Sequence, residues 1–183
     1  SLQKASEFDA ILKGPVGDPK LRLADGTEAS SISGILRNGL DLYANVRPII
    51  LLPNIEGCRG MKPGEIDYVI VRENTEGLYA SRGKGIGNDN VMNDILMLTR
   101  TGVERIAQFA FKLARKRGLN RSTGTATVTC VDKSNVLRTM AFFRKIVTEV
   151  SLEYPDVELK YIYSDACAQA MVLYPEQFDV LVM

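Results

Sequence analysis

Three arginines stand beside apolar residues or turns in two segments of the chain. Arg37 and Arg47 lie in the segment 36–48, and Arg72 lies in the segment 69–79. A guanidinium group is always charged, and its planar fork can hold a carboxylate through two parallel hydrogen bonds. Three such groups meeting at one point would suit a small acid with two or three carboxylates. Three separate surface arginines, with their stems lying on apolar neighbours, are the plainer alternative.

A lysine and an aspartate follow two expected strands. Lys133 lies in the Asp-Lys-Ser-Asn sequence at 132–135, and Asp165 follows a serine. Asp and Ser are favoured helix caps, so Asp132 or Ser134 could begin one helix and Asp165 another. A cation near a helix N-terminus is unfavourable unless an anion lies close by. Lys133 therefore indicates a bound carboxylate nearby, or a lysine that takes part in proton transfer.

Composition narrows the chemistry. The 183 residues are 45% hydrophobic and 25% charged, with a formal net charge of +1 and no histidine. These are ordinary globular values, and the length allows one large domain or one and a part. Without histidine there is no Ser-His-Asp triad, so acid–base work falls to Lys, Tyr, Asp, Glu or water. The three cysteines match no zinc spacing or disulfide framework, and neither a spanning helix nor a signal stretch is evident. We expect a soluble, cytoplasmic protein.

Strand and helix patterns alternate through the second half of the chain, which is typical of a layered α/β domain. Helices are expected at 31–40, from Thr101 to the residue before Gly118, from about 136 to 150, and at 166–173. Strands are expected at 8–13, 42–52, 66–71, 94–99, 125–131, 157–163 and 178–183, with a further extended piece at 78–81. Functional groups in such sheets lie beyond the carboxyl ends of the strands, so a chain that stops at a buried strand looks incomplete.

Three local signals refine these elements. Thr101-Gly102-Val103-Glu104 reads as a capping box at the start of the clearest helix. Pro48 within a strand favours an edge position, because proline cannot donate to a neighbouring strand. The glycine-rich segment 81–90 lacks the lysine–serine context of a phosphate loop, so it predicts a hairpin tip or an arm.

Five motifs occur in an order that is recognisable. They are Leu36-Arg37, DLYANVRP at 41–48, VRENTEGLY at 71–79, VDKSNV at 131–136 and SDA at 164–166. The chain resembles the β-decarboxylating dehydrogenases, which act on isopropylmalate, isocitrate, homoisocitrate, tartrate or D-malate. The resemblance covers nearly the whole chain and implies the isocitrate/isopropylmalate dehydrogenase fold. The family's later metal-binding aspartates and adenosine-binding loop are absent, so we expect a fragment from the middle of a subunit, inactive by itself.

The resemblance implies a reaction. The hydroxyl of a 3-substituted malate would be oxidised by hydride transfer to NAD or NADP, and the β-carboxylate would leave as CO2, with Mg2+ or Mn2+ as Lewis acid. By this resemblance, the malate carboxylates would be bound by Arg37, Arg47 and Arg72. Lys133 would remove the hydroxyl proton, and Tyr79 would protonate the enol. Asp165 would bind the metal, and Asn135 would lie near the nicotinamide.

The resemblance also implies an organisation. Residues 1–42 would be a remnant of the larger, cofactor-side domain, and residues 43–183 the smaller domain that forms a homodimer. An arm at about 81–99 would pair with its counterpart, and Lys133 and Asp165 would serve the partner subunit's site.

The substrate's third substituent is left open by the sequence. Ser31 matches a serine of the isocitrate enzymes, but Ser33 replaces their asparagine. Ser30, Ser33 and Gly34 stand where isopropylmalate enzymes carry an acid and bulky leucines. We expect 3-isopropylmalate first, because that branch is widespread, with isocitrate, tartrate and D-malate close behind. A non-catalytic regulatory or dimerisation subunit is the alternative, and a phosphate-binding module at Gly83–Gly87 is a weaker third.

Overall fold

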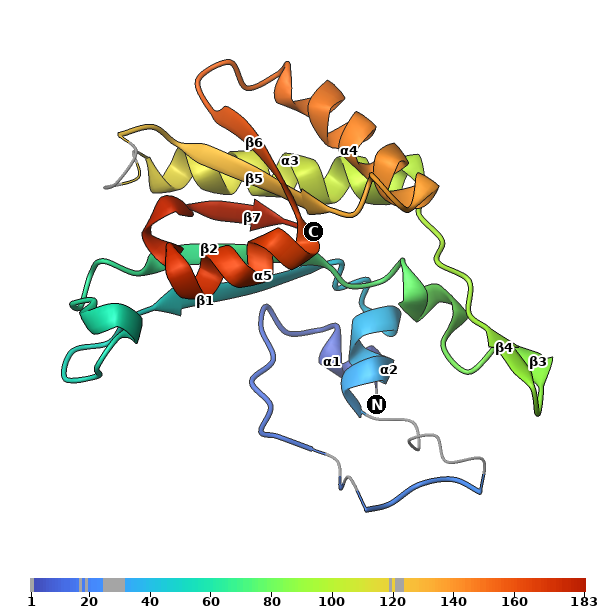
Figure 1. The fold of residues 1–183 in the computed structure, drawn as a ribbon. Helices are drawn as coiled ribbons and strands as arrows, with labels where there is room; N and C mark the ends of the chain where they lie inside the picture. Colours follow the sequence, from blue (N-terminus) through green and yellow to red (C-terminus); the bar gives the residue numbers. More distant parts are fainter. Residues whose placement is uncertain (1, 17, 19, 25–31, 119, 121–123) are drawn as a thin grey trace.

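The computed structural model describes residues 2–16, 18, 20–24, 32–118, 120 and 124–183. Its centre is a five-stranded sheet with the order β1-β2-β7-β5-β6 (Figure 1). β2, β7, β5 and β6 run parallel, and β1 is antiparallel to β2 at the edge. The strands of this sheet are β1 (Ala44–Ile50), β2 (Asp67–Glu73), β5 (Thr127–Asp132), β6 (Glu158–Tyr163) and β7 (Val180–Val182).

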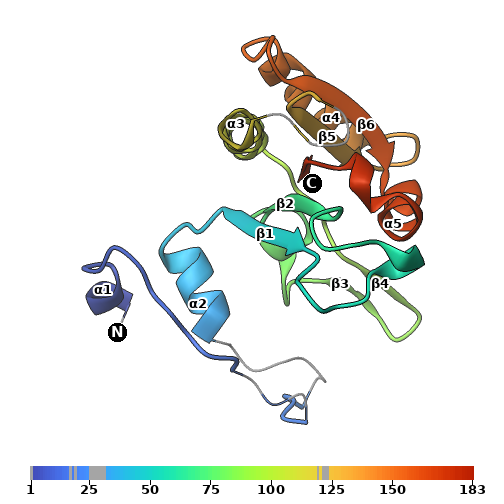
Figure 2. The same cartoon turned by 90° about the vertical axis from the view of Figure 1, so that its left-hand side faces the viewer.

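Helices cover both faces of this sheet. The α-helices are α1 (Leu2–Ala5), α2 (Ile32–Gly39), α3 (Arg100–Arg117), α4 (Arg138–Ser151) and α5 (Ser164–Leu173). Short 3-10 helices are η1 (Cys58–Gly60), η2 (Leu78–Ser81) and η3 (Pro175–Gln177). Figure 1 shows α3 and α4 on one face and α5 on the other, and Figure 2 shows α1 and α2 on the β1 side. None of these helices is long and apolar enough to cross a membrane, as far as the described residues go.

Side chains of β7 divide between the two faces, because successive residues of a strand point to opposite sides. Val180 and Val182 belong to the core cluster under α3 and α4, whereas Leu181 packs in a second cluster with Cys167 of α5. Burial raises the pKa of the Cys167 thiol to about 11. A parallel sheet covered on both faces confirms the predicted α/β class.

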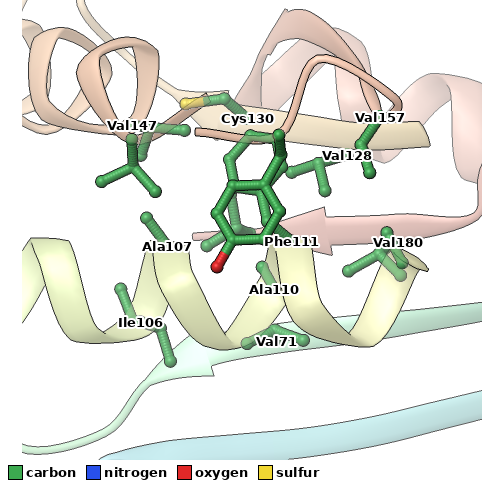
Figure 3. Packing of buried hydrophobic residues seen from close by; sticks show 14 of the residues in the cluster. Val71, Ile106, Ala107, Ala110, Phe111, Val128, Cys130, Val147, Val157 and Val180 are labelled. Atoms are coloured by element: carbon green, nitrogen blue, oxygen red, sulfur yellow. The ribbon is translucent and has the colours of Figure 1, made fainter. Parts of the chain in front are cut away.

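The main core forms where α3 lies on the sheet (Figure 3). All six residues of the predicted apolar stripe of α3 are fully buried: Val103, Ile106, Ala107, Ala110, Phe111 and Ala114. Phe111 stacks on Tyr154 with ring centroids 5.1 Å apart. Helical spacing of apolar residues was therefore sufficient to identify the buried face of this helix.

The start of α3 differs from the prediction. Thr99, not Thr101, is the N-cap, and its Oγ1 accepts a hydrogen bond from the Gly102 N–H at 3.0 Å. Glu76 accepts from the Thr99 N–H at 2.8 Å and also from its hydroxyl. This is the reciprocal bonding of a capping box, but its carboxylate comes from a distant segment rather than from the helix itself. A Cβ on Gly102 would lie 2.4 Å from the Glu76 carboxylate, so the glycine leaves room for it.

Three expected extended segments are not strands. Residues 8–13 pair with no strand among the described residues, and Leu12 is fully exposed there. The 78–81 segment is the 3-10 helix η2, closed by the Ser81 hydroxyl, which donates to the carbonyl of Ile95 at 2.7 Å. Residues 94–99 form only an isolated bridge, between Gly77 and Met97. Apolar alternation alone does not make a strand where no partner strand lies alongside.

The remaining elements agree with the sequence. The glycine-rich segment forms the hairpin of β3 (Ile86–Asn88) and β4 (Val91–Asn93). β1 is an edge strand and contains Pro48, as expected. The helix expected at 31–40 is α2 (Ile32–Gly39), and Ser31 lies outside the described residues.

We predict that Thr99→Ala will lower the free energy of unfolding by about 1 kcal/mol, because the N-cap acceptor is lost. Gly102→Ala should have at least the same effect, since its methyl group would displace Glu76. Thr101→Ala, at an exposed position inside the helix, is the matched control and should leave stability unchanged or raise it slightly. Urea denaturation measures all three, and a larger loss for Thr101→Ala than for Thr99→Ala would contradict the observed cap.

Candidate active site

The larger cavity brings together three of the residues singled out from the sequence. Its volume is about 590 Å³, and Arg72 of β2, Tyr79 of η2 and Lys133, just after β5, all contribute to its wall. Its apolar wall consists of Leu78, Leu96, Leu98, Val131, Leu137, Met140, Phe143 and Met183. One chain thus brings an arginine, a tyrosine and a lysine to the wall of one largely apolar space.

A smaller cavity adjoins the first through a shared residue. It measures about 250 Å³ and is lined by Arg37 of α2, by Tyr79, and by Asn74, Arg82 and Lys84. Tyr79 lines both cavities. The structure therefore places Arg37 near Tyr79, but in a different cavity from Arg72 and Lys133.

The arginines of β1 and β2 are connected through two asparagines. Asn45 pairs directly with Arg72 across the strands, and Arg47 lies two residues on, on the same face. Arg72 Nη2 donates to Asn74 Oδ1 at 3.1 Å, and Asn45 Nδ2 donates to the same oxygen at 3.4 Å. Arg47 Nε donates to Asn45 Oδ1 at 3.3 Å. Arg47 itself lines neither cavity, so it is the member of the predicted arginine trio that the structure leaves outside.

Arg72 packs against the Tyr79 ring. Its guanidinium lies 5.4 Å from the centroid of that ring, and its Nε is buried without a hydrogen-bond partner. A buried unsatisfied donor is costly. Because this nitrogen is covered by protein, a ligand in the larger cavity would have to contact Arg72 through its other atoms.

Sequence reasoning missed the role of Asn74. The side chain is 6% exposed, and its Nδ2 donates to the Leu42 carbonyl at 3.2 Å while its Oδ1 receives Arg72. A buried amide next to a site arginine was the available signal. Its importance was not evident from the sequence, because its partners lie 29 and 32 residues away.

Glu73 and Arg105 hold the segment that carries these groups. The buried Glu73 carboxylate accepts from the Thr75 N–H at 2.8 Å and from the Thr75 hydroxyl at 2.7 Å. Arg105 of α3 donates to Thr75 Oγ1 at 2.8 Å and to Asp41 Oδ2 at 2.7 Å. The turn after Arg72 is therefore tied to α3 and to the link between α2 and β1.

Lys133 and Asp165 form an ion pair. Lys133 Nζ lies 2.7 Å from Asp165 Oδ1, with the two side chains 30% and 70% exposed. The hydrogen bond from Lys133 holds the pKa of the Asp165 carboxyl below its usual value. Asp165 lies in the first turn of α5, whose N-cap is Tyr163, so the interpretation of Asp165 as a cap is wrong.

Asp132 is not a helix cap either. α4 begins only at Arg138, with Leu137 as its N-cap and no side-chain cap. The buried Asp132 carboxylate instead receives Arg144 Nε at 2.7 Å and the Ser134 N–H at 2.8 Å. These bonds shape the turn from which Lys133 projects.

The described residues do not by themselves complete a metal or nucleotide site. Among them, no group of three or more Asp, Glu, Cys or His side chains could hold a metal ion. Magnesium is usually bound by one or two carboxylates together with waters and substrate, so Asp165 could supply one ligand but not a site. Asn135 is exposed and lines neither cavity. Ser31 lies outside the described residues.

Comparison with known proteins identifies the class. The chain matches the family described as isocitrate/isopropylmalate dehydrogenase over residues 1–183, and it belongs to that family. It is 38% identical to a 3-isopropylmalate dehydrogenase of Carboxydothermus hydrogenoformans, over 100% of this chain and 49% of the relative. A 3-isopropylmalate dehydrogenase of Bacillus cereus is 41% identical, over 95% of this chain and 47% of the relative.

A solved structure agrees with the fold. The isocitrate dehydrogenase from Methylococcus capsulatus superposes with a TM-score of 0.75 and is 39% identical, covering 93% of this chain and 47% of that one. These comparisons confirm the family and the fold that the sequence motifs indicated. The chain spans about half the length of the curated relatives it matches.

We predict that Asp132→Asn will destabilise the protein by about 3 kcal/mol, because it leaves Arg144 without its buried charged partner. The matched control is Asp165→Asn, which removes an exposed carboxylate from a comparable ion pair and should leave the unfolding midpoint unchanged. Thermal unfolding of both variants makes the comparison. An unchanged unfolding midpoint for Asp132→Asn would show that the Asp132 pair does not stabilise the protein.

Proposed function

We propose that the protein containing this chain catalyses the NAD(P)-dependent oxidative decarboxylation of a 3-substituted malate. The observation that carries the proposal is the common cavity of Arg72, Tyr79 and Lys133. A carboxylate-binding group, a weak acid and an amine around one space are the groups this reaction needs at the substrate. Family membership supports the same conclusion.

Each residue has a role that its surroundings support. Arg72 would bind a substrate carboxylate at the wall of the larger cavity, and Arg37 would bind another from the adjoining cavity. Lys133 would take the proton of the substrate hydroxyl, and Tyr79, between the two cavities, would donate a proton to the enol left after CO2 departs. Arg47, which donates a hydrogen bond to Asn45, would offset the substrate's negative charge from a greater distance.

Cofactor and metal would be bound largely outside the described residues. NAD or NADP would accept the hydride, and Asn135 would be the residue of this part of the chain that lies near the nicotinamide. Mg2+ or Mn2+ would polarise the substrate's oxygens, with Asp165 supplying one ligand and others coming from elsewhere in the protein. We propose that residues 1–42 belong to a larger cofactor-side domain and residues 43–183 to the smaller one. Three unpaired cysteines fit a reducing compartment such as the cytoplasm.

3-Isopropylmalate is the substrate we propose first. Several relatives are named for it, and the apolar wall formed by Leu78, Leu96 and Leu98 would suit a branched alkyl group. Isocitrate, with a third carboxylate, and D-malate or tartrate, with smaller substituents, would leave this wall in contact with water. A regulatory subunit would need none of the groups around the cavity.

The proposed reaction is tested by a panel assay of the purified, intact protein that contains this chain. Isopropylmalate, isocitrate, D-malate and tartrate are each supplied with NAD and with NADP, in the presence of Mg2+ or Mn2+, and reduced cofactor is followed by absorbance. We expect turnover that is fastest with isopropylmalate and that requires the metal. No turnover with any of the four acids would contradict the proposal and favour the regulatory alternative.

A lysine variant completes this test. Lys133→Met should lower kcat by about 100-fold or more, because the proton acceptor is lost. Lys145→Met, at an exposed position of α4, is the control and should retain full activity. An unchanged kcat for Lys133→Met would remove Lys133 from the mechanism.

We further propose a homodimer that shares its sites. The hairpin of β3 and β4 carries exposed apolar side chains, with Ile86 68% and Met92 65% exposed, which a second subunit would cover. Lys133 and Asp165 would then act with Arg72 and Tyr79 of the opposite subunit, although Lys133 also lines the larger cavity with Arg72 and Tyr79 of its own chain.

Hybrid dimers distinguish a shared site from a site within one chain. Lys133→Met and Arg72→Met subunits, each inactive alone, are mixed, unfolded and refolded together. Sharing predicts recovery of about a quarter of wild-type activity, since half of the dimers are hybrid and each has one intact site. If both groups act within one chain, every site stays defective and no activity returns.

A further inference from the structure

The surroundings of Lys133 contain an aromatic ring to which the proposed reaction gives no role. Lys133 Nζ lies 5.7 Å from the centroid of the Tyr163 ring. Tyr163 is the last residue of β6 and pairs directly with Asp132, the last residue of β5. The ring and the lysine therefore come from the carboxyl ends of adjacent parallel strands.

The same ring is held by a second cation. Arg144 of α4 lies 5.3 Å from the Tyr163 ring centroid and 4.8 Å from that of Tyr161. Arg144 is itself fixed by the buried Asp132 carboxylate, through Nε at 2.7 Å and Nη2 at 3.2 Å. Asp132, Lys133, Tyr163 and Arg144 are thus linked by a continuous set of contacts.

This arrangement restricts where the ammonium group can go. A lysine side chain has several rotatable bonds, so Nζ can take many positions unless neighbouring groups restrict it. The negative face of the Tyr163 ring attracts the ammonium from one side, while Asp165 Oδ1 receives its hydrogen bond at 2.7 Å. The Asp165 side chain is 70% exposed, so its hydrogen bond orients the Lys133 ammonium group but restricts its movement little.

We propose that Tyr163 is a positioning residue for Lys133: its aromatic face, held by Arg144, keeps the ammonium group at the wall of the larger cavity. The ring is required, and the phenol hydroxyl is not. The proposal rests on the role of Lys133 in the proposed reaction, but the contact between ring and lysine can be measured without any reaction.

The test uses four variants of the protein. Tyr163→Leu removes the ring and should lower kcat by about tenfold or more, with KM for the hydroxy acid changed less than threefold, because positioning affects the reacting geometry. Tyr163→Phe keeps the ring and should retain most of the kcat of the unaltered protein. Tyr161→Leu is the matched control: Tyr161 also lies against Arg144 and is 42% exposed, but it is not in contact with Lys133, and its loss should leave kcat unchanged.

A fourth variant, the double variant, shows whether Tyr163 acts through Lys133. In the Lys133→Met background, Tyr163→Leu should have no further effect on kcat, because the group it positions is gone. A tenfold loss in that background as well, or an equal loss in Tyr161→Leu, would contradict the proposal and indicate a general structural role. Thermal unfolding checks that each variant is folded.

A readout without turnover separates this inference from the proposed function. Lysines are reductively methylated with 13C-formaldehyde, and the Lys133 signal is assigned by its loss in Lys133→Arg. The Tyr163 ring current should shift that signal upfield, and Tyr163→Leu should abolish the shift. If the protein turns over no hydroxy acid but the shift is present, the contact stands and the reaction is wrong. An unshifted Lys133 signal in the unaltered protein would overturn the contact itself.

Discussion

The ion pair between Asp132 and Arg144 determines the geometry of the candidate site. Asp132 ends β5, an interior strand of the sheet between β7 and β6, and is 2% exposed, so its charge must be balanced within the protein. Arg144 provides that balance from α4 and at the same time lies on Tyr161 and Tyr163 of β6. One buried interaction thereby joins a helix and two strands at the point where Lys133 leaves the sheet.

A second constraint acts at the other side of the larger cavity. The turn after β2 folds around the buried carboxylate of Glu73, and Arg105 ties it to α3. This turn leads into η2, which carries Tyr79, and it begins beside Arg72. Two polar networks, each anchored on a buried carboxylate at a strand end, therefore face one another across an apolar space. That arrangement explains how the chain brings an arginine, a tyrosine and a lysine to the wall of one cavity.

The sequence predicted elements whose signals are local. The stripe of α3, the glycine after it, the edge position of Pro48 and the buried strands were all readable, because periodicity and backbone chemistry act within a few residues. The helix cap at Thr99 could not be predicted from the sequence, because its carboxylate partner, Glu76, is 23 residues away. The segment 8–13 has the composition of a strand, but a strand also requires a neighbour, which sequence composition does not supply.

The candidate site was predictable by residue type but not by arrangement. The motifs named the arginines, Tyr79, Lys133 and Asp165, and the structure gathers Arg72, Tyr79 and Lys133 while placing Arg37 in the adjoining cavity. Arg47 and Asn135 line neither cavity. Asn74 and Tyr163 were not given roles from the sequence, because their importance depends on partners that come close only after folding.

The account depends on one spatial claim: the substrate's carboxylates and its hydroxyl meet Arg72, Tyr79 and Lys133 around the larger cavity. A crystal structure of the protein with a bound 3-substituted malate tests it most directly. The account predicts a substrate carboxylate within hydrogen-bond distance of the Arg72 guanidinium and the hydroxyl within reach of a Lys133 ammonium group. A substrate bound elsewhere, with no carboxylate on the Arg72 guanidinium, would contradict it.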